Sequence, residues 1–104
     1  MGIEIRRDGG RAEMALTGEL SIYTVAEIKD ALAKLLAHAD DVEIDLSGIS
    51  EMDTAGLQLM LIAKRYPGKA VRFVRHSSVV LRLVDLANLG GALGDPLFIA
   101  ADRS

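Results

Sequence analysis

Residues 45–57 read DLSGISEMDTAGL, a run of small and polar residues that separates two segments of different periodicity. At its start, Val42, Ile44 and Leu46 alternate with acidic residues, which predicts a short strand over residues 42–46. After it, residues 54–65 are apolar on nearly all sides, as expected for a helix packed between a sheet and another element. We therefore expect a strand, a loop over residues 47–53 and a buried helix, in that order.

The segments on the N-terminal side extend this pattern. Residues 3–16 predict a β-hairpin, because apolar and polar residues alternate on both sides of an Asp-Gly-Gly turn at residues 8–10. Residues 25–38 predict a helix, and Thr24 followed three residues later by Glu27 predicts a capping box at its start. Its apolar stripe consists of Ile28, Leu32, Leu35 and Leu36.

The segments on the C-terminal side continue the alternation of strands and helices. Residues 70–75 predict a strand, and Ser77 or Ser78 can cap a third helix that runs to about Ala87. A glycine-containing loop at residues 88–94 and a short strand at residues 97–99 complete the chain.

The predicted order, β-β-α-β-α-β-α-β, is typical of the α/β class with a mixed β-sheet packed against helices. The chain has 104 residues, of which 50% are hydrophobic and 26% are charged. This size and composition predict a single folded domain over residues 1–104.

The composition argues against several classes of function. A net charge of −3 offers no basic surface for nucleic acid. The absence of cysteine excludes disulfides and thiolate chemistry, and no segment approaches the roughly 20 apolar residues of a membrane span. We therefore expect a cytoplasmic protein without membrane insertion. Two histidines and 4% aromatic residues supply few groups for catalysis, so we expect no enzyme activity, no cofactor and no metal.

Two interpretations of residues 45–57 remain open on physical grounds. Loops after strands commonly carry function in α/β sheets, and the start of a helix presents free N–H groups to a partner. Alternatively, Asp53 or Thr54 merely caps the following helix. A phosphate on Thr54 would be favoured by the helix dipole and opposed by the neighbouring charge of Asp53.

Three short motifs add a family resemblance that covers essentially the whole chain. They are LTGEL at residues 16–20, IDLSG at residues 44–48 and MDTAGL at residues 52–57. In this order and spacing they resemble the STAS domain family of anti-sigma factor antagonists. The resemblance implies a regulatory module that binds an anti-sigma-type serine/threonine kinase or another regulatory ATPase. It also implies that the partner phosphorylates Thr54 and that the phosphate releases the complex.

The resemblance implies a partner-binding surface made of Ser21, Asp53, Thr54, Ala55 and Gly56. The sequence departs from the family at two of these positions. Ser21 stands where many members have an acidic residue, and Thr54 replaces the commoner serine. The segments GELSIYT at residues 18–24 and GDPL at residues 94–97 resemble STAS domains encoded beside chemotaxis-type signalling components. The identity of the partner and the oligomeric state are left open.

Other functions are weaker alternatives. The same fold serves as an accessory subunit of lipid-transport ABC ATPases, where an Asp-Thr-x-Gly loop also occurs in related domains. An enzyme or small-ligand binder would need a pocket of convergent polar groups, which the sequence does not display. Acidic residues at positions 43, 45, 51 and 53 match no calcium loop, and residues 90–94 match no phosphate loop. His76 and Ser77 with Asp85 lack a nucleophile elbow.

Overall fold

The computed structural model describes residues 2–87. Its elements follow the predicted order: β1 (Gly2–Asp8), β2 (Arg11–Leu20), α1 (Val25–Leu36), β3 (Asp41–Met52), α2 (Thr54–Lys64), β4 (Ala70–Val74) and α3 (Ser78–Leu86). The predicted loop at residues 88–94 and strand at residues 97–99 lie outside the described residues.

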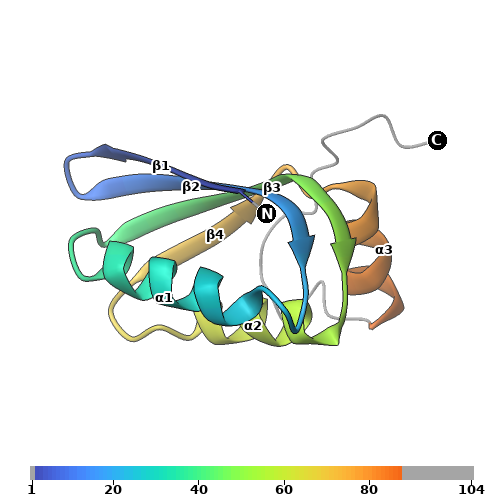
Figure 1. The fold of residues 1–104 in the computed structure, drawn as a ribbon. Helices are drawn as coiled ribbons and strands as arrows, with labels where there is room; N and C mark the ends of the chain where they lie inside the picture. The colour runs from blue at the N-terminus through green and yellow to red at the C-terminus, as the bar shows by residue number, and fades with distance from the viewer. Residues whose placement is uncertain (1, 88–104) are drawn as a thin grey trace.

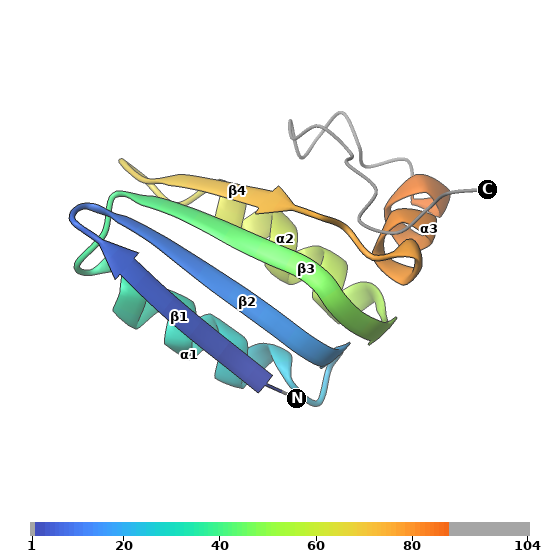
Figure 2. The same cartoon turned by 90° about the horizontal axis from the view of Figure 1, so that it is seen from above.

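The four strands form one mixed sheet in the order β1-β2-β3-β4 (Figure 2). β1 and β2 pair antiparallel through the turn at residues 9 and 10, which confirms the N-terminal hairpin. β2–β3 and β3–β4 are parallel pairs, so the chain must cross over the sheet between them. Those crossovers are α1 and α2, and both lie on the same face of the sheet (Figure 1).

The hydrophobic core lies between the sheet and these two helices. Alternate strand residues point into it, among them Met14, Ile44 and Phe73, each no more than 3% exposed. The predicted stripe of α1 is confirmed, because all of its members are buried: Ile28, Leu32, Leu35 and Leu36. α3 contacts β3 and lies beside the bent end of that strand (Figure 1).

β3 is longer than predicted, and the expected loop at residues 47–53 is wrong. The pairing with β2 slips once between Ala15 and Thr17 and again between Gly18 and Glu19, each time leaving an extra residue on β3. Such bulges bend a strand and change which residues face the core. Leu46 and Ile49 are therefore both buried although they are three residues apart. This break in alternation made the second half of the strand resemble a loop.

The capping box at the start of α1 is also wrong. The side chain of Thr24 makes no capping hydrogen bond to the helix. Its Oγ1 instead accepts from the N–H of Ser21 at 3.0 Å and donates to the carbonyl oxygen of Glu19 at 2.9 Å. The hydroxyl therefore stabilises the preceding turn rather than the helix end. α1 begins at Val25 as predicted and ends at Leu36, two residues before the predicted end at His38.

The remaining elements agree with the predictions to within one residue. α2 buries Leu57, Leu59 and Met60, and β4 covers residues 70–74. Ser77 is the N-cap of α3, where its Oγ accepts from the N–H of Val80 at 3.4 Å. Within residues 2–87, no helix has both the length and the apolar character needed to cross a bilayer.

Candidate functional site

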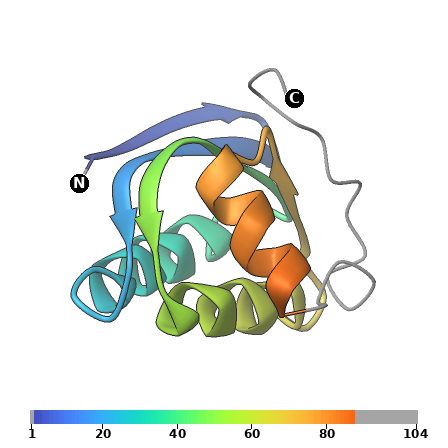
Figure 3. The ribbon, with the colours of Figure 1, turned by 90° about the vertical axis from the view of Figure 1, so that its right-hand side faces the viewer.

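The ends of β2 and β3 bend together over the helix layer and deliver the chain to the starts of α1 and α2 (Figure 3). The turn over residues 21–24 therefore lies beside the first residues of α2. Asp53, which precedes α2, makes two hydrogen bonds to this region: its Oδ2 accepts from the N–H of Ile22 at 3.0 Å, and its N–H donates to the carbonyl oxygen of Leu20 at the end of β2 at 3.3 Å. The structure thus brings the two predicted parts of the site together.

Asp53 is the N-cap of α2, and of the two residues that the capping interpretation left open, Asp53 and Thr54, it is the one that caps. Its Oδ1 accepts from the N–H groups of Ala55 at 2.9 Å and Gly56 at 3.4 Å, which satisfies two of the free donors at the helix start. Its other oxygen holds Ile22. One carboxylate therefore fixes both the helix and the neighbouring turn.

Thr54 is the first residue of α2, and its side chain is exposed. Because Asp53 acts as the cap, the helix does not need the hydroxyl of Thr54. In the part of the chain that is described, this hydroxyl forms no hydrogen bond. The group is thus presented to solvent at the positive end of the helix dipole.

Gly56 allows the start of α2 to approach β2. A methyl group at this position would lie 2.6 Å from the carbonyl oxygen of Leu20 and 2.9 Å from the Cγ of Leu20. Both distances are too short for a carbon atom, so a side chain here would push the helix away from the strand. Gly56 is buried, so it presents no group of its own at the surface.

Ser21 lies inside the turn rather than on its surface, with 5% of its area exposed. Its Oγ accepts from the N–H of Tyr23 at 3.2 Å, and its carbonyl oxygen accepts from Thr24 and Val25. The turn instead exposes Ile22 and Tyr23, which were not among the predicted site residues. The sequence signal for them was a pair of large apolar residues in the segment just before a predicted helix start, where polar residues are usual.

The other candidate sites do not assemble. Ser77 caps α3, His76 is fully buried and Asp85 is exposed. Within residues 2–87, no three His, Asp or Glu side chains come close enough together to hold a metal ion.

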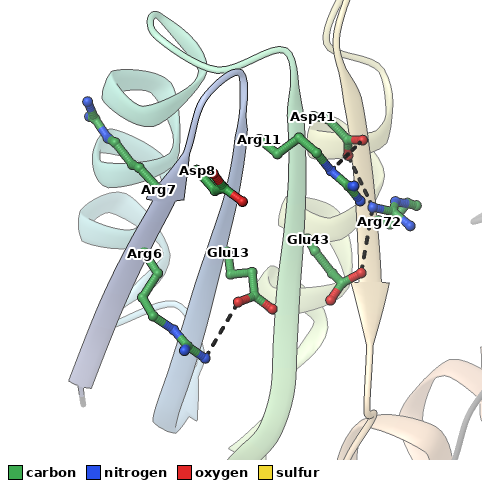
Figure 4. A pocket seen from close by; sticks show the side chains of 9 residues that line it. Arg6, Arg7, Asp8, Arg11, Glu13, Asp41, Glu43 and Arg72 are labelled. Carbon is green, nitrogen blue, oxygen red and sulfur yellow. Dashed lines mark hydrogen bonds and ion pairs between the residues drawn. The ribbon is translucent and has the colours of Figure 1, made fainter.

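The face of the sheet away from α1 and α2 carries a shallow hollow of about 340 Å³ lined by arginine and acidic side chains (Figure 4). Ion pairs cross from strand to strand there: Arg6 with Glu13, Arg11 with Asp41, and Arg72 with both Asp41 and Glu43. These charged groups compensate one another across the strands. The acidic residues at positions 41 and 43 are thereby engaged with arginine.

A further ion pair on this face joins Arg75 Nε to Asp45 Oδ2 at 2.8 Å. Burial alone would raise the pKa of Asp45, but hydrogen bonds from Ser47 and Arg75 outweigh it and hold the pKa below its ordinary value of 3.8. The same pair raises the pKa of Arg75. Asp45 therefore stabilises the start of the first bulge as a carboxylate.

Comparison with known proteins places these features in context. A family model described as "Mlab, STAS domain" matches residues 3–98. The anti-sigma-B factor antagonist of Staphylococcus epidermidis is 32% identical over 81 residues, which are 74% of this chain and 75% of that protein. The anti-sigma-F factor antagonist RsfB of Mycobacterium tuberculosis is 26% identical over 90 residues, or 84% of this chain and 74% of RsfB.

Solved structures share the fold. An anti-sigma factor antagonist from Mycobacterium paratuberculosis superposes with a TM-score of 0.79 at 17% identity and covers 93% of this chain and 86% of its own. The unphosphorylated form of the anti-sigma factor antagonist SpoIIAA gives 0.70 at 17% identity, covering 86% and 84%. The phosphorylated form of the Bacillus protein SpoIIAA gives 0.66 at 17% identity, covering 86% of each chain.

Proposed function

Because the chain belongs to the STAS domain family, we propose that it is an anti-sigma factor antagonist whose partner-binding surface is centred on Thr54. It acts by binding rather than by catalysis, and its partner is an anti-sigma-type serine/threonine kinase or another regulatory ATPase. The partner supplies the ATP chemistry, and the chain is its substrate. The site comprises Ser21, Asp53, Thr54, Ala55 and Gly56, of which the buried Ser21 and Gly56 shape the surface from beneath.

The observation that carries this proposal is that Asp53 caps the helix and so leaves the neighbouring Thr54 hydroxyl exposed. Asp53 caps α2, while the hydroxyl of Thr54 is exposed one residue later. A phosphate there would add a charge of about −1.5 to −2 and three acceptor oxygens to the surface without removing the cap. The domain would stay folded, but a partner docked over Thr54 would meet a new charged group. Phosphorylation would therefore release the partner.

The remaining site residues support this arrangement indirectly. Ser21 shapes the turn beside Asp53, Ala55 donates to the cap, and Gly56 lets the helix approach β2. We place the protein in the cytoplasm, within a signalling cluster of chemotaxis type. The alternative of an accessory subunit in a lipid-transport ATPase is not favoured, because the relatives and solved structures compared above are anti-sigma factor antagonists.

The test uses substitutions at Thr54 and a matched control. Thr54→Ala should abolish phosphorylation by the purified cognate kinase, detected by intact mass, and should keep parent-like affinity. Thr54→Glu should weaken binding, because it places a charge in the interface. Ser78→Glu is the control, since Ser78 is likewise the exposed first residue of a helix after its N-cap.

The outcomes separate the parts of the proposal. Equal affinities for the parent, Thr54→Ala and Thr54→Glu would overturn the switch. Equal weakening by Thr54→Glu and Ser78→Glu would show a nonspecific charge effect. Unequal affinities without labelling would keep the binding surface and discard phosphorylation.

A further inference from the structure

We propose that Ile22 and Tyr23 are the apolar anchor of this surface and that they insert into a hydrophobic pocket of the partner kinase. The inference rests on the proposed function and adds the chemistry of the contact. It assigns the main binding free energy to two side chains outside the motif that carries Thr54.

Ile22 and Tyr23 are exposed to solvent. Among residues 2–87, five large apolar side chains are exposed: Ile5, Ile22, Tyr23, Ile62 and Leu86. Ile22 and Tyr23 are adjacent in the chain, and their exposed fractions are 63% and 86%. Burying them in a partner would remove apolar area from water, which is the main favourable term in association. Tyrosine is also enriched among the residues that dominate binding energy at interfaces.

The backbone of the turn is held in one conformation by hydrogen bonds. Hydrogen bonds hold every peptide of the turn that carries the pair. The N–H of Ser21 donates to Thr24 Oγ1, the N–H of Ile22 to Asp53 Oδ2 and the N–H of Tyr23 to Ser21 Oγ, all between 3.0 and 3.2 Å. Those of Thr24 and Val25 both donate to the carbonyl oxygen of Ser21 at 2.9 Å. A backbone ordered before binding loses little entropy in the complex, which favours affinity.

The turn with Ile22 and Tyr23 is linked directly to the helix start that carries Thr54. Asp53 uses one oxygen to cap the helix that begins at Thr54 and the other to hold Ile22. The anchor and the proposed phosphorylation site are therefore two parts of one surface, linked through a single carboxylate. A phosphate at the edge of an apolar contact and next to an aspartate is disruptive, because it must lose water and is repelled by the neighbouring charge. An apolar anchor thus gives phosphorylation at Thr54 a physical means of releasing the partner.

The charge around the turn favours a protein over a membrane as the partner of Ile22 and Tyr23. Acidic residues lie on the three elements next to the turn: Glu19 and Glu51 are the next-to-last residues of β2 and β3, and Glu27 lies in the first turn of α1. Glu27 and Glu51 are exposed. This charge would be repelled by an anionic lipid surface, which attracts basic segments instead. A protein pocket that takes Ile22 and Tyr23 fits the surface better.

The test measures affinity for the purified kinase that labels Thr54, using the full-length chain. Tyr23→Ala should weaken binding at least about 30-fold, the scale of an interface hot spot, and Ile22→Ala at least about fivefold. Tyr23→Phe should bind within about threefold of the parent, because it keeps the apolar ring. Ile5→Ala is the matched control, since Ile5 is an exposed apolar residue on β1, and it should bind like the parent.

Each outcome decides between the two proposals. Parent-like binding by Tyr23→Ala, while Thr54→Glu binds weakly, would overturn the anchor and leave the proposed function standing. Weak binding by Tyr23→Ala with parent-like binding by Thr54→Glu would support the anchor and overturn the switch. No binding of the parent chain to the kinase would overturn both. Tyr23-dependent flotation with phosphatidylglycerol vesicles would assign the pair to a membrane and overturn the protein pocket.

Discussion

The absence of a side chain at Gly56 allows α2 to approach β2 closely. Gly56→Ala should lower the free energy of unfolding by about 1–3 kcal/mol, because the new methyl group would lie 2.6 Å from the backbone oxygen of Leu20. Denaturant unfolding measures this loss. Gly10→Ala is the control, since a methyl group there would meet no atom within 4 Å. Equal effects of the two substitutions would show that the contact with Leu20 relaxes without cost.

Thr24 stabilises a turn rather than a helix end, and this difference has a measurable consequence. Thr24→Ala should cost about 1–2 kcal/mol, because the N–H of Ser21 and the carbonyl oxygen of Glu19 lose a partner. Glu27→Ala should cost at most about 1 kcal/mol through its interaction with the helix dipole. In equilibrium unfolding the double mutant should lose the sum of the two. A coupling free energy above about 0.5 kcal/mol between the two substitutions would instead indicate a reciprocal cap.

Part of the site was predictable from local sequence. The helix start at Thr54 was predicted, and Asp53 was one of two residues proposed as its cap, because capping depends on neighbours within three residues. The bond from Ile22 to Asp53 joins residues 31 apart in the chain. No local pattern specifies such a contact, since it depends on how far β2 and β3 bend. The exposure of Ile22 and Tyr23 depends on the same bend and was missed for the same reason.

At the scale of elements, the apolar stripe of α1 provides the next prediction. Leu32 lies in the middle of the stripe and is 2% exposed, so Leu32→Ala should destabilise the fold by about 2–5 kcal/mol. Chemical denaturation is the measurement, and Lys29→Ala on the exposed side of the same helix is the control. A loss below about 0.5 kcal/mol would mean that Leu32 does not pack against the sheet.

Elements were predictable wherever one periodicity continued without interruption. α1 and α2 keep their apolar faces throughout, and their starts at Val25 and Thr54 were predicted correctly. β3 keeps its alternation only as far as Leu46, after which two extra residues shift the phase. A bulge is stabilised by pairing with another strand, and the sequence of one strand does not contain that information.

At the scale of the whole molecule, Asp45 makes stability depend on pH. Its pKa is lowered in the folded chain, so its stabilising effect is fully present above the ordinary value of 3.8 and is lost as the pH falls through the folded value. The parent should therefore exceed Asp45→Asn in unfolding free energy at pH 7, and the difference should shrink below about pH 4. Urea unfolding at a series of pH values measures it. A difference that stays constant with pH would remove the carboxylate from the explanation.

β1 is joined to the sheet along one side only, and residues 4–8 of its seven-residue length are exposed. It can therefore detach from β2 while the parallel strands stay closed, a sub-global opening that needs less free energy than complete unfolding. Amide hydrogens of β1 should then exchange with deuterium well before those in the first half of β3, which pairs on both sides. Equal free energies of opening for β1 and β3 would show that β1 opens only when the whole domain unfolds. Earlier exchange in β1 than in β3 would show that the hairpin edge opens separately from the parallel strands that lead to the surface around Thr54.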